Sequence, residues 1–148
     1  MSSCLPLTPG QKVTFSKTLS ESDIYLFAGI TGDLARNHVD EEYMKRSVYG
    51  RRIAHGVLLM GFMSTASTLI LENYTKENSA ETPVSLGYDR VRFVKPVFIN
   101  DTITVHYEIK EIDLEKSRSR SQIDVKNQHG DTVAVAEHIL AWVKNEVS

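Results

Sequence analysis

Asp33 and His38 stand five residues apart in a polar segment that begins at Gly32. A carboxylate accepts a proton, and an imidazole can accept or donate one near neutral pH, so these residue types suit general acid–base catalysis. If one short connector holds both, they could converge on a single water molecule. The alternative is an ordinary turn aspartate beside a histidine that is only a satisfied polar group, and spacing alone does not choose between the two.

Gly56 opens the most apolar segment of the chain, and Ser64 follows eight residues later. Unpaired N–H groups at a helix start favour negative charge, and a glycine lets a ligand approach the backbone closely. The Gly56 N–H is therefore a candidate oxyanion donor, a group typically worth roughly 3–4 kcal/mol of barrier. Alternatively, this glycine only permits tight helix–sheet packing. Ser64 either bonds a carbonyl one turn earlier or orients Asp33 or the water.

Helices must position these groups, and residues typical of helix ends lie before and after them in the sequence. Ser20 and Asp23 form a predicted N-terminal cap, and Gly32 is the predicted end of that helix. Residues 32–39 are predicted to be a connector, and Asp40 to cap a short helix that runs to residue 45. A long helix is predicted over residues 55–71. It has apolar residues on every side, which predicts burial on every side.

The remaining segments predict β-structure. Val, Ile, Tyr and Phe alternate with polar residues in these stretches, as in half-buried strands. Pro96 interrupts one of them, and the sequence at 127–131 predicts a hairpin turn. A loop is expected at 76–82. The predicted strands span 11–19, 85–95, 103–109, 117–126 and 132–144. This order indicates an α+β domain whose antiparallel sheet curls around the long helix.

Composition narrows the functional classes. The chain has 148 residues, 41% hydrophobic and 24% charged, with a net charge of −2, which fits one globular domain and argues against nucleic-acid and membrane binding. The apolar run 57–63 is too short to span a bilayer. The lone Cys4 and the absence of a leader sequence predict a reducing, cytoplasmic location. Two ligands, Asp33 and His38, are too few for a metal, and no third His or Cys lies at ligand spacing, so no metal is expected.

Three motifs together resemble the MaoC-like dehydratases, the family that contains the (R)-specific enoyl-CoA hydratases. The first, at 25–33, reads Tyr-x-Phe-Ala-Gly-x-Thr-Gly-Asp and is followed by His38. The second, at 53–58, reads Ile-Ala-His-Gly-Val-Leu. The third, at 89–98, reads Asp-Arg-Val-Arg-Phe-Val-Lys-Pro-Val-Phe, with Asp-Thr-Ile soon after it. The resemblance extends from about residue 10 to residue 145.

The resemblance implies a single hot-dog domain over residues 1–148, irregular at 1–9, in which an antiparallel sheet wraps a long central helix. Two subunits would pair their sheets edge to edge, giving a homodimer or a dimer-based oligomer with active sites at the interface. The implied reaction is the reversible syn hydration of a trans-2-enoyl-CoA to an (R)-3-hydroxyacyl-CoA, which needs no metal or redox cofactor. Short acyl chains are expected because a single small domain has limited room for a long tail. Asp33 and His38 would activate the water, the Gly56 N–H would bind the thioester oxygen, and Ser64 would support the site.

The family pattern places Asn and Pro where this chain has Ala35 and Arg36. An asparagine amide and a proline ring both favour a tight turn, so their loss predicts a looser connector. Arg36 could meet a phosphate or an acidic substrate, or simply face water.

Residues around the site are assigned to substrate binding. His55 and Val57 flank Gly56, and His55 is expected to order the turn rather than to react. Basic side chains are candidates for the coenzyme A phosphates, with a solvated surface as the alternative for each; they are Arg51, Arg52, Arg90, Arg92 and Lys95. No role is assigned to His106, His129 or His138.

Two other functions remain open. One is an acyl-CoA thioesterase on the same fold, with Asp33 directing water to the carbonyl carbon. The other is an acyl-CoA-binding subunit without activity, which the Ala35 substitution would allow.

Overall fold

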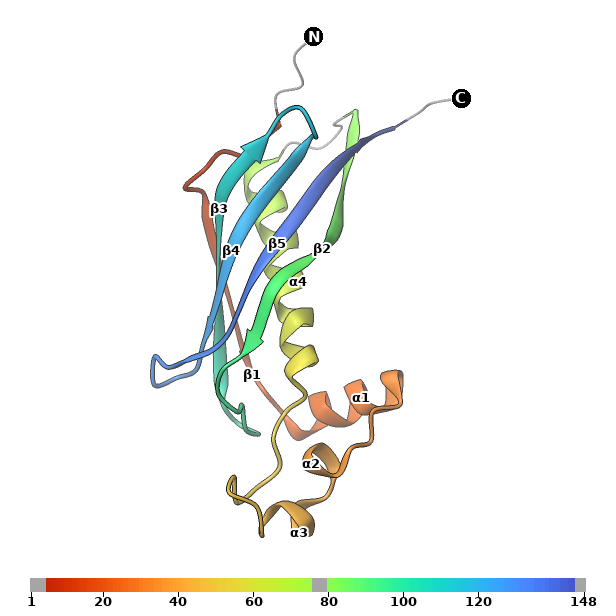
Figure 1. Ribbon diagram of the computed structural model, residues 1–148, viewed down its shortest axis with the longest axis vertical. Coiled ribbons are helices and arrows are strands. Elements are labelled where there is room, and N and C mark those ends of the chain that lie inside the picture. The colour runs from red at the N-terminus through yellow and green to blue at the C-terminus, as the bar shows by residue number, and fades with distance from the viewer. Residues whose placement is uncertain (1–4, 76–79, 146–148) are drawn as a thin grey trace.

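A computed structural model describes residues 5–75 and 80–145 of the chain. Five antiparallel strands form one sheet in the order β1-β3-β4-β5-β2, and a long helix lies against it (Figure 1). The strands are β1 (Lys12–Thr18), β2 (Glu81–Phe93), β3 (Thr102–Asp113), β4 (Arg118–Lys126) and β5 (Thr132–Lys144). This is the predicted α+β architecture of an antiparallel sheet packed on a long central helix.

The sheet forms where the sequence alternates. In β3 the residues Ile103, Val105, Tyr107 and Ile109 are all buried, whereas most of the polar residues between them are not. Period-two alternation places one set of side chains on the concave face, so burying that set pins the register of the strand. The β4–β5 hairpin turns at 127–131 as predicted.

The central helix α4 (Gly56–Tyr74) packs against β1 and β3. Leu59, Met63, Ala66 and Ile70 form its buried face. The expectation that this helix is buried on every side is wrong for the single chain. An exposed stripe runs along α4 and consists of Val57, Gly61, Ser64, Thr68 and Glu72. One sheet covers one side of a helix, however apolar the other side is.

Three short helices form a lobe beyond the end of the sheet, next to the start of α4 (Figure 1). They are α1 (Glu21–Thr31), α2 (Arg36–Val39) and α3 (Glu41–Met44). The predicted caps are present: Ser20 and Asp23 form a reciprocal capping box, and Asp40 accepts a hydrogen bond from the Tyr43 N–H. Gly32 ends α1 with φ 78°, a conformation that glycine adopts without strain. The predicted connector is therefore partly helical.

A buried arginine fastens this lobe together. The Arg52 guanidinium donates to Glu21 at 2.6 Å, to the Tyr25 hydroxyl at 2.7 Å and to Glu41 at 2.9 Å. The planar fork of arginine suits such multiple contacts. Because Arg52 lies just before the segment that enters α4, its bonds tie α1 and α3 to the chain that leads to Gly56.

The structure changes some predicted boundaries. Strand β2 begins at Glu81, inside the predicted loop at 76–82, and residues 76–79 of that loop lie outside the described part. Of the N-terminal segment predicted to be irregular, residues 1–4, with Cys4, also lie outside it. Leu5 and Leu7 have no regular structure but are 4% and 2% exposed, because they pack into the core.

None of the helices in residues 5–75 and 80–145 is long and apolar enough to cross a membrane.

Candidate active site

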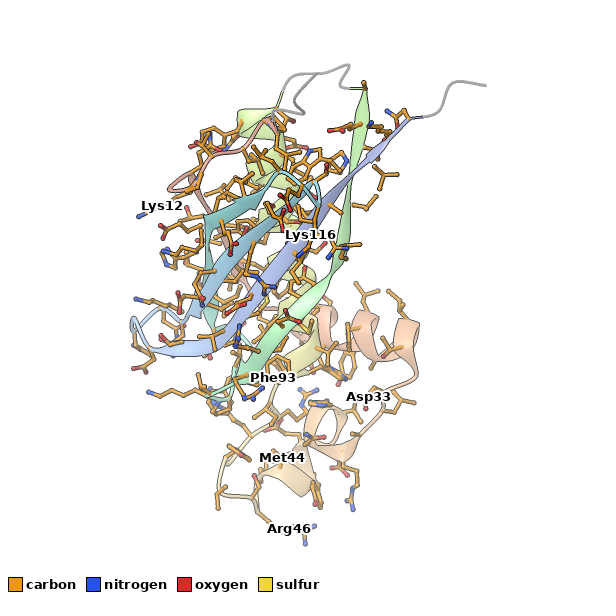
Figure 2. All side chains as sticks on the ribbon, turned by 45° about the horizontal axis from the view of Figure 1, so that its top comes forward. Lys12, Asp33, Met44, Arg46, Phe93 and Lys116 are labelled. Atoms are coloured by element: carbon orange, nitrogen blue, oxygen red, sulfur yellow. The ribbon has the colours of Figure 1, made fainter. Side chains whose placement is uncertain are left out.

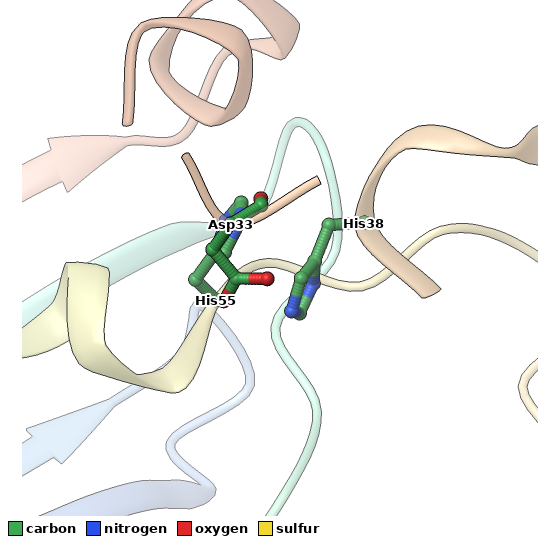
Figure 3. A group of neighbouring side chains, drawn as sticks. All are labelled: Asp33, His38 and His55. Carbon is green, nitrogen blue, oxygen red and sulfur yellow. The ribbon is translucent and has the colours of Figure 1, made fainter. Parts of the chain in front are cut away.

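Asp33 stands on the connector directly after the left-handed turn at Gly32. Its N–H donates to the Thr31 hydroxyl at 3.2 Å, and its carboxylate accepts from the Ala35 N–H at 3.3 Å. The side chain is exposed and points toward the His38 ring (Figure 3). One bond thus holds the Asp33 backbone and the other holds its carboxylate, which keeps most of its lone pairs free.

His38 lies in α2 and is buried, at 8% exposure. Its Nδ1 is 2.7 Å from the Ile53 carbonyl oxygen. A carbonyl oxygen only accepts, so Nδ1 carries the proton and Nε2 keeps a lone pair. Burial lowers the pKa of His38 and the neighbouring His55 lowers it further, while the Ile53 bond and the Asp33 carboxylate raise it, with a net lowering. His38 is therefore a neutral ring with a basic nitrogen.

His55 joins the pair, although the sequence separates it from Asp33 by 22 residues. Its ring is 2% exposed and stacks on His38 with centroids 3.7 Å apart. Its Nε2–H donates to the Asp33 carbonyl oxygen at 3.0 Å. Phe27 packs on it, with ring centroids 4.7 Å apart. Figure 3 shows the three side chains of Asp33, His38 and His55 together.

Each member of this trio offers a ligand atom, and these atoms all lie within 4.8 Å of one another. Asp33 and His38 were predicted as two possible metal ligands, and the fold adds His55 as a third. However, the two rings are inclined by only 28°. Imidazole lone pairs lie in the ring plane, so stacked rings project them side by side, whereas a tetrahedral metal needs nitrogens that converge on one point. As arranged, the trio fits proton transfer better than metal binding.

Gly56 begins α4 beside this trio. In the described part of the chain no backbone carbonyl accepts from its N–H, and the N-cap residue His55 supplies no side-chain cap. The ring of Phe93 occupies the space that a side chain at 56 would need: an added Cβ would lie 2.7 Å from ring carbons. Close packing thus requires a glycine here, and the same glycine leaves an N–H at a helix start.

A cleft of about 360 Å³ opens at this point. His38 and Gly56 line it from the helical side, and Phe93 and Lys95 line it from the end of β2. Figure 2 shows Phe93 at that end of β2, next to the lobe that carries Asp33. His38 Nε2 and the Gly56 N–H therefore lie near the same cleft, and the Asp33 carboxylate is close to His38.

Ser64 lies elsewhere in the single chain. It is exposed on α4, about 12 Å along the helix axis from Gly56 at 1.5 Å per residue. Burial raises the pKa of the Tyr88 phenol in β2, and the Ser64 hydroxyl lowers it, so Ser64 lies next to that strand. The structure does not bring Ser64 to Asp33 within one chain. Val57 is 56% exposed in the first turn of α4 and contributes no wall to the cleft.

The basic side chains predicted to bind the coenzyme A phosphates differ in their partners. Lys95 lines the cleft and pairs with Asp131 at 3.1 Å, and the exposed Arg51 stacks over the Phe98 ring at 3.9 Å. Arg90 bonds Glu137 at 2.6 Å, away from the cleft lining. The side chains of Arg52 and Arg92 bond within the protein as well. Within the described residues, Arg51 forms no ion pair and instead contacts an aromatic ring.

The departure at Ala35 and Arg36 has a local structure. Ala35 takes the N-cap position of α2 and supplies no side-chain cap. Arg36 bonds Asp40 at 2.9 and 3.0 Å and stacks over the Tyr43 ring, so it ties α2 to α3 rather than facing the cleft. In place of an asparagine cap and a proline, this connector has the Asp33–Ala35 and Arg36–Asp40 bonds.

Asn37, Tyr49 and Phe93 are among the cleft residues that were not predicted from the sequence. Asn37 and Phe93 sit beside residues that were singled out, but no local spacing signals that the Phe93 ring covers Gly56. That contact joins distant segments and appears only in the folded chain.

Residues 6–134 match the MaoC-like domain family. An (R)-specific enoyl-CoA hydratase of Rhodospirillum rubrum is 37% identical over 108 residues, which is 72% of this chain and 69% of the relative. The unliganded (R)-hydratase of Pseudomonas aeruginosa superposes with a TM-score of 0.75 at 28% identity, over 96% of this chain and 88% of the other. The (R)-hydratase of Aeromonas caviae, at 23% identity, shares the fold with a TM-score of 0.80, over 93% and 98% of the two chains.

Proposed function

The chain belongs to the MaoC-like dehydratase family, and from this premise we propose that it is an (R)-specific enoyl-CoA hydratase. It would be a hydro-lyase that adds water reversibly to a trans-2-enoyl-CoA and forms an (R)-3-hydroxyacyl-CoA. A 3-hydroxybutyryl-CoA dehydratase of Methylorubrum extorquens, 32% identical over 114 residues, acts on a short chain by its name, and we expect short acyl chains here too.

The observation that carries the proposal is the tautomer of His38. Its Nδ1–H is held by the Ile53 carbonyl, so the basic Nε2 is available beside Asp33. Water attacks the β-carbon through its oxygen while His38 Nε2 takes one of its protons, and Asp33 orients the water. The electron pair of the alkene moves onto the thioester oxygen, and a proton from the acid–base pair then reaches the α-carbon.

The enolate oxygen needs a donor while this charge exists. The N–H of Gly56 lies at the start of a 19-residue helix and at the wall of the cleft, which supports its role as that donor. Proton transfer contributes about 10²–10⁴-fold and one oxyanion donor roughly 3–4 kcal/mol. These steps use only side chains and backbone of this chain, so the proposal needs no cofactor.

We place the coenzyme A phosphates near Lys95, which lines the cleft, and near the exposed Arg51. The exposed edge of β2 and the exposed stripe of α4 support a homodimer that pairs these edges, and Ser64 lies on that stripe. A single cysteine fits the cytoplasm as the location.

The test is a spectrophotometric screen of enoyl-CoA esters of graded length. We expect loss of enoyl absorbance on crotonyl-CoA without release of free thiol. Asp33→Asn and His38→Ala should each reduce this rate by at least about 10²-fold. Release of free thiol would establish a thioesterase instead. Binding without any turnover would establish a non-catalytic acyl-CoA-binding subunit.

A further inference from the structure

His55 contacts both members of the acid–base pair. Its Nε2–H bonds the Asp33 carbonyl oxygen at 3.0 Å, and its ring face lies on His38 with centroids 3.7 Å apart. It is also the N-cap residue of α4, so its backbone continues directly into Gly56. One residue therefore spans the acid–base pair and the proposed oxyanion donor.

An ordinary structural role does not account for this histidine. Helix N-caps favour Ser, Thr, Asp or Asn, whose oxygens bond first-turn N–H groups, whereas His55 makes no such bond. Its Nδ1 is buried and has no hydrogen-bond partner in the described residues. An unsatisfied buried polar atom typically costs about 1–3 kcal/mol, and such atoms are rare in folded proteins.

The two contacts constrain different motions. The bond to the Asp33 carbonyl fixes the connector against translation, and it acts on the main chain, so the carboxylate stays free. The stacked ring limits rotation of His38 about its side-chain bonds, while the Ile53 carbonyl holds its Nδ1. Phe27 also packs against His55 and leaves it little room to move.

We propose that His55 is a positioning residue that sets the distance between the Asp33–His38 pair and the Gly56 N–H. This inference rests on the proposed hydratase function and assigns His55 a task within it. Displacement of a catalytic group by about 1 Å can cost about 10²-fold in rate, so a residue that fixes this distance acts mainly on kcat.

Two substitutions separate the two contacts. His55→Phe keeps a flat ring against His38 but removes the donor to Asp33. His55→Gln keeps an N–H donor at the place of Nε2 but removes the ring. We expect kcat to fall about 10²-fold in His55→Phe and about 10-fold in His55→Gln, with KM within about threefold of the wild type. His106→Gln, on the exposed face of β3, is the matched control and should leave kcat unchanged.

The pH profile gives a readout that a purely structural role would not move. The groups that face His38 are the Asp33 carboxylate, the Ile53 carbonyl and His55. Burial lowers the pKa of His38 and His55 lowers it further, so a neutral residue at position 55 should raise the pKa of His38. The acidic limb of kcat/KM should then shift to higher pH in both variants.

Side-chain NMR of ¹⁵N-histidine-labelled protein tests the inference without substrate. His38 should change its chemical shifts and titrate at higher pH in both variants, while their thermal unfolding shows that they are folded. If the wild type hydrates crotonyl-CoA but both variants keep kcat within twofold and His38 is unchanged, the inference is wrong. If the wild type is inactive but His38 responds, the proposed function fails and the positioning stands. A loss confined to KM would instead make His55 a substrate contact and overturn the proposal.

Discussion

His55 at the start of α4 and His138 in the middle of β5 invite comparison, because both are buried and both stack on a neighbouring ring. His138 is 0% exposed and lies on Tyr88 with centroids 4.4 Å apart. Its Nδ1 is 2.7 Å from the Tyr107 hydroxyl, and its Nε2 is 2.7 Å from the Ser85 hydroxyl. Burial and stacking therefore do not distinguish the two histidines.

The hydrogen bonds of His55 and His138 distinguish the two residues. Hydroxyl groups can donate or accept, so the two partners of His138 satisfy whichever tautomer it adopts. His55 faces a carbonyl that fixes its tautomer, and its other nitrogen has no partner in the described residues. The comparison teaches that a fully partnered buried histidine belongs to the core, whereas a partly partnered one beside a cleft points to a site.

The strongest way to break this comparison is to remove His138. We expect His138→Ala to lower the free energy of unfolding by about 3 kcal/mol, since it leaves a cavity and strands the Tyr107 hydroxyl. The hydration rate per folded molecule should stay within about threefold of the wild type. Urea unfolding combined with the crotonyl-CoA assay measures both quantities.

For His38→Ala we expect the reverse of His138→Ala: a large loss of hydration rate and a smaller loss in the free energy of unfolding. If His138→Ala loses rate as His38→Ala does while remaining folded, His138 is part of the site and the distinction by hydrogen bonds is invalid.

A second prediction sharpens the comparison through pH. Burial lowers the pKa of His138 to about 4, from 6.5 for an unperturbed histidine. Above pH 6.5 the ring is neutral in both states and its stabilising contribution is fully present. As pH falls toward 4, the unfolded chain gains a proton that the folded chain does not, so stability is lost. The loss should be about 2 kcal/mol between pH 7 and pH 4.5.

His138→Phe removes this titration and should lose correspondingly less stability over the same range. The lowered pKa of His38 acts in the same direction and remains in both proteins, so the difference between the two unfolding curves isolates His138. Parallel curves from pH 7 to pH 4.5 would contradict the assignment.

The smallest expected effect is on the stability of the connector that carries Asp33 and His38. Ala35 occupies the N-cap of α2 without a cap bond, so Ala35→Asn should stabilise the chain by about 1 kcal/mol. Thermal unfolding measures the gain, and Arg36→Pro in the same background tests whether the Arg36–Asp40 bond compensates for the missing proline. A destabilised Ala35→Asn variant would mean that the connector already has its preferred turn.

Local signals in the sequence predicted much of the fold. The capping box at Ser20, the stop at Gly32 and the alternation in β3 each act over a few residues, so each can be recognised without the fold. The same holds for Asp33 and His38, which share one connector. The exposed stripe of α4 was missed because an apolar sequence does not reveal how many sides the sheet can cover.

The missed parts of the site are contacts between distant segments. His55 reaches Asp33 because Arg52 fastens the lobe in place, and Phe93 reaches Gly56 because β2 ends there. Neither pairing has a spacing signature. Residue types alone marked His55 and Gly56 as candidates, but only the packing of the lobe against α4 gives them neighbours.

The ring of Phe93 standing where a Cβ at 56 would lie has a consequence for how this protein can change. Position 56 can accept a methyl group only if the ring at position 93 moves or is replaced by a smaller side chain, so the two sites should vary together among descendants of this chain. A library that randomises Gly56 alone should return fewer active variants than one that also randomises position 93.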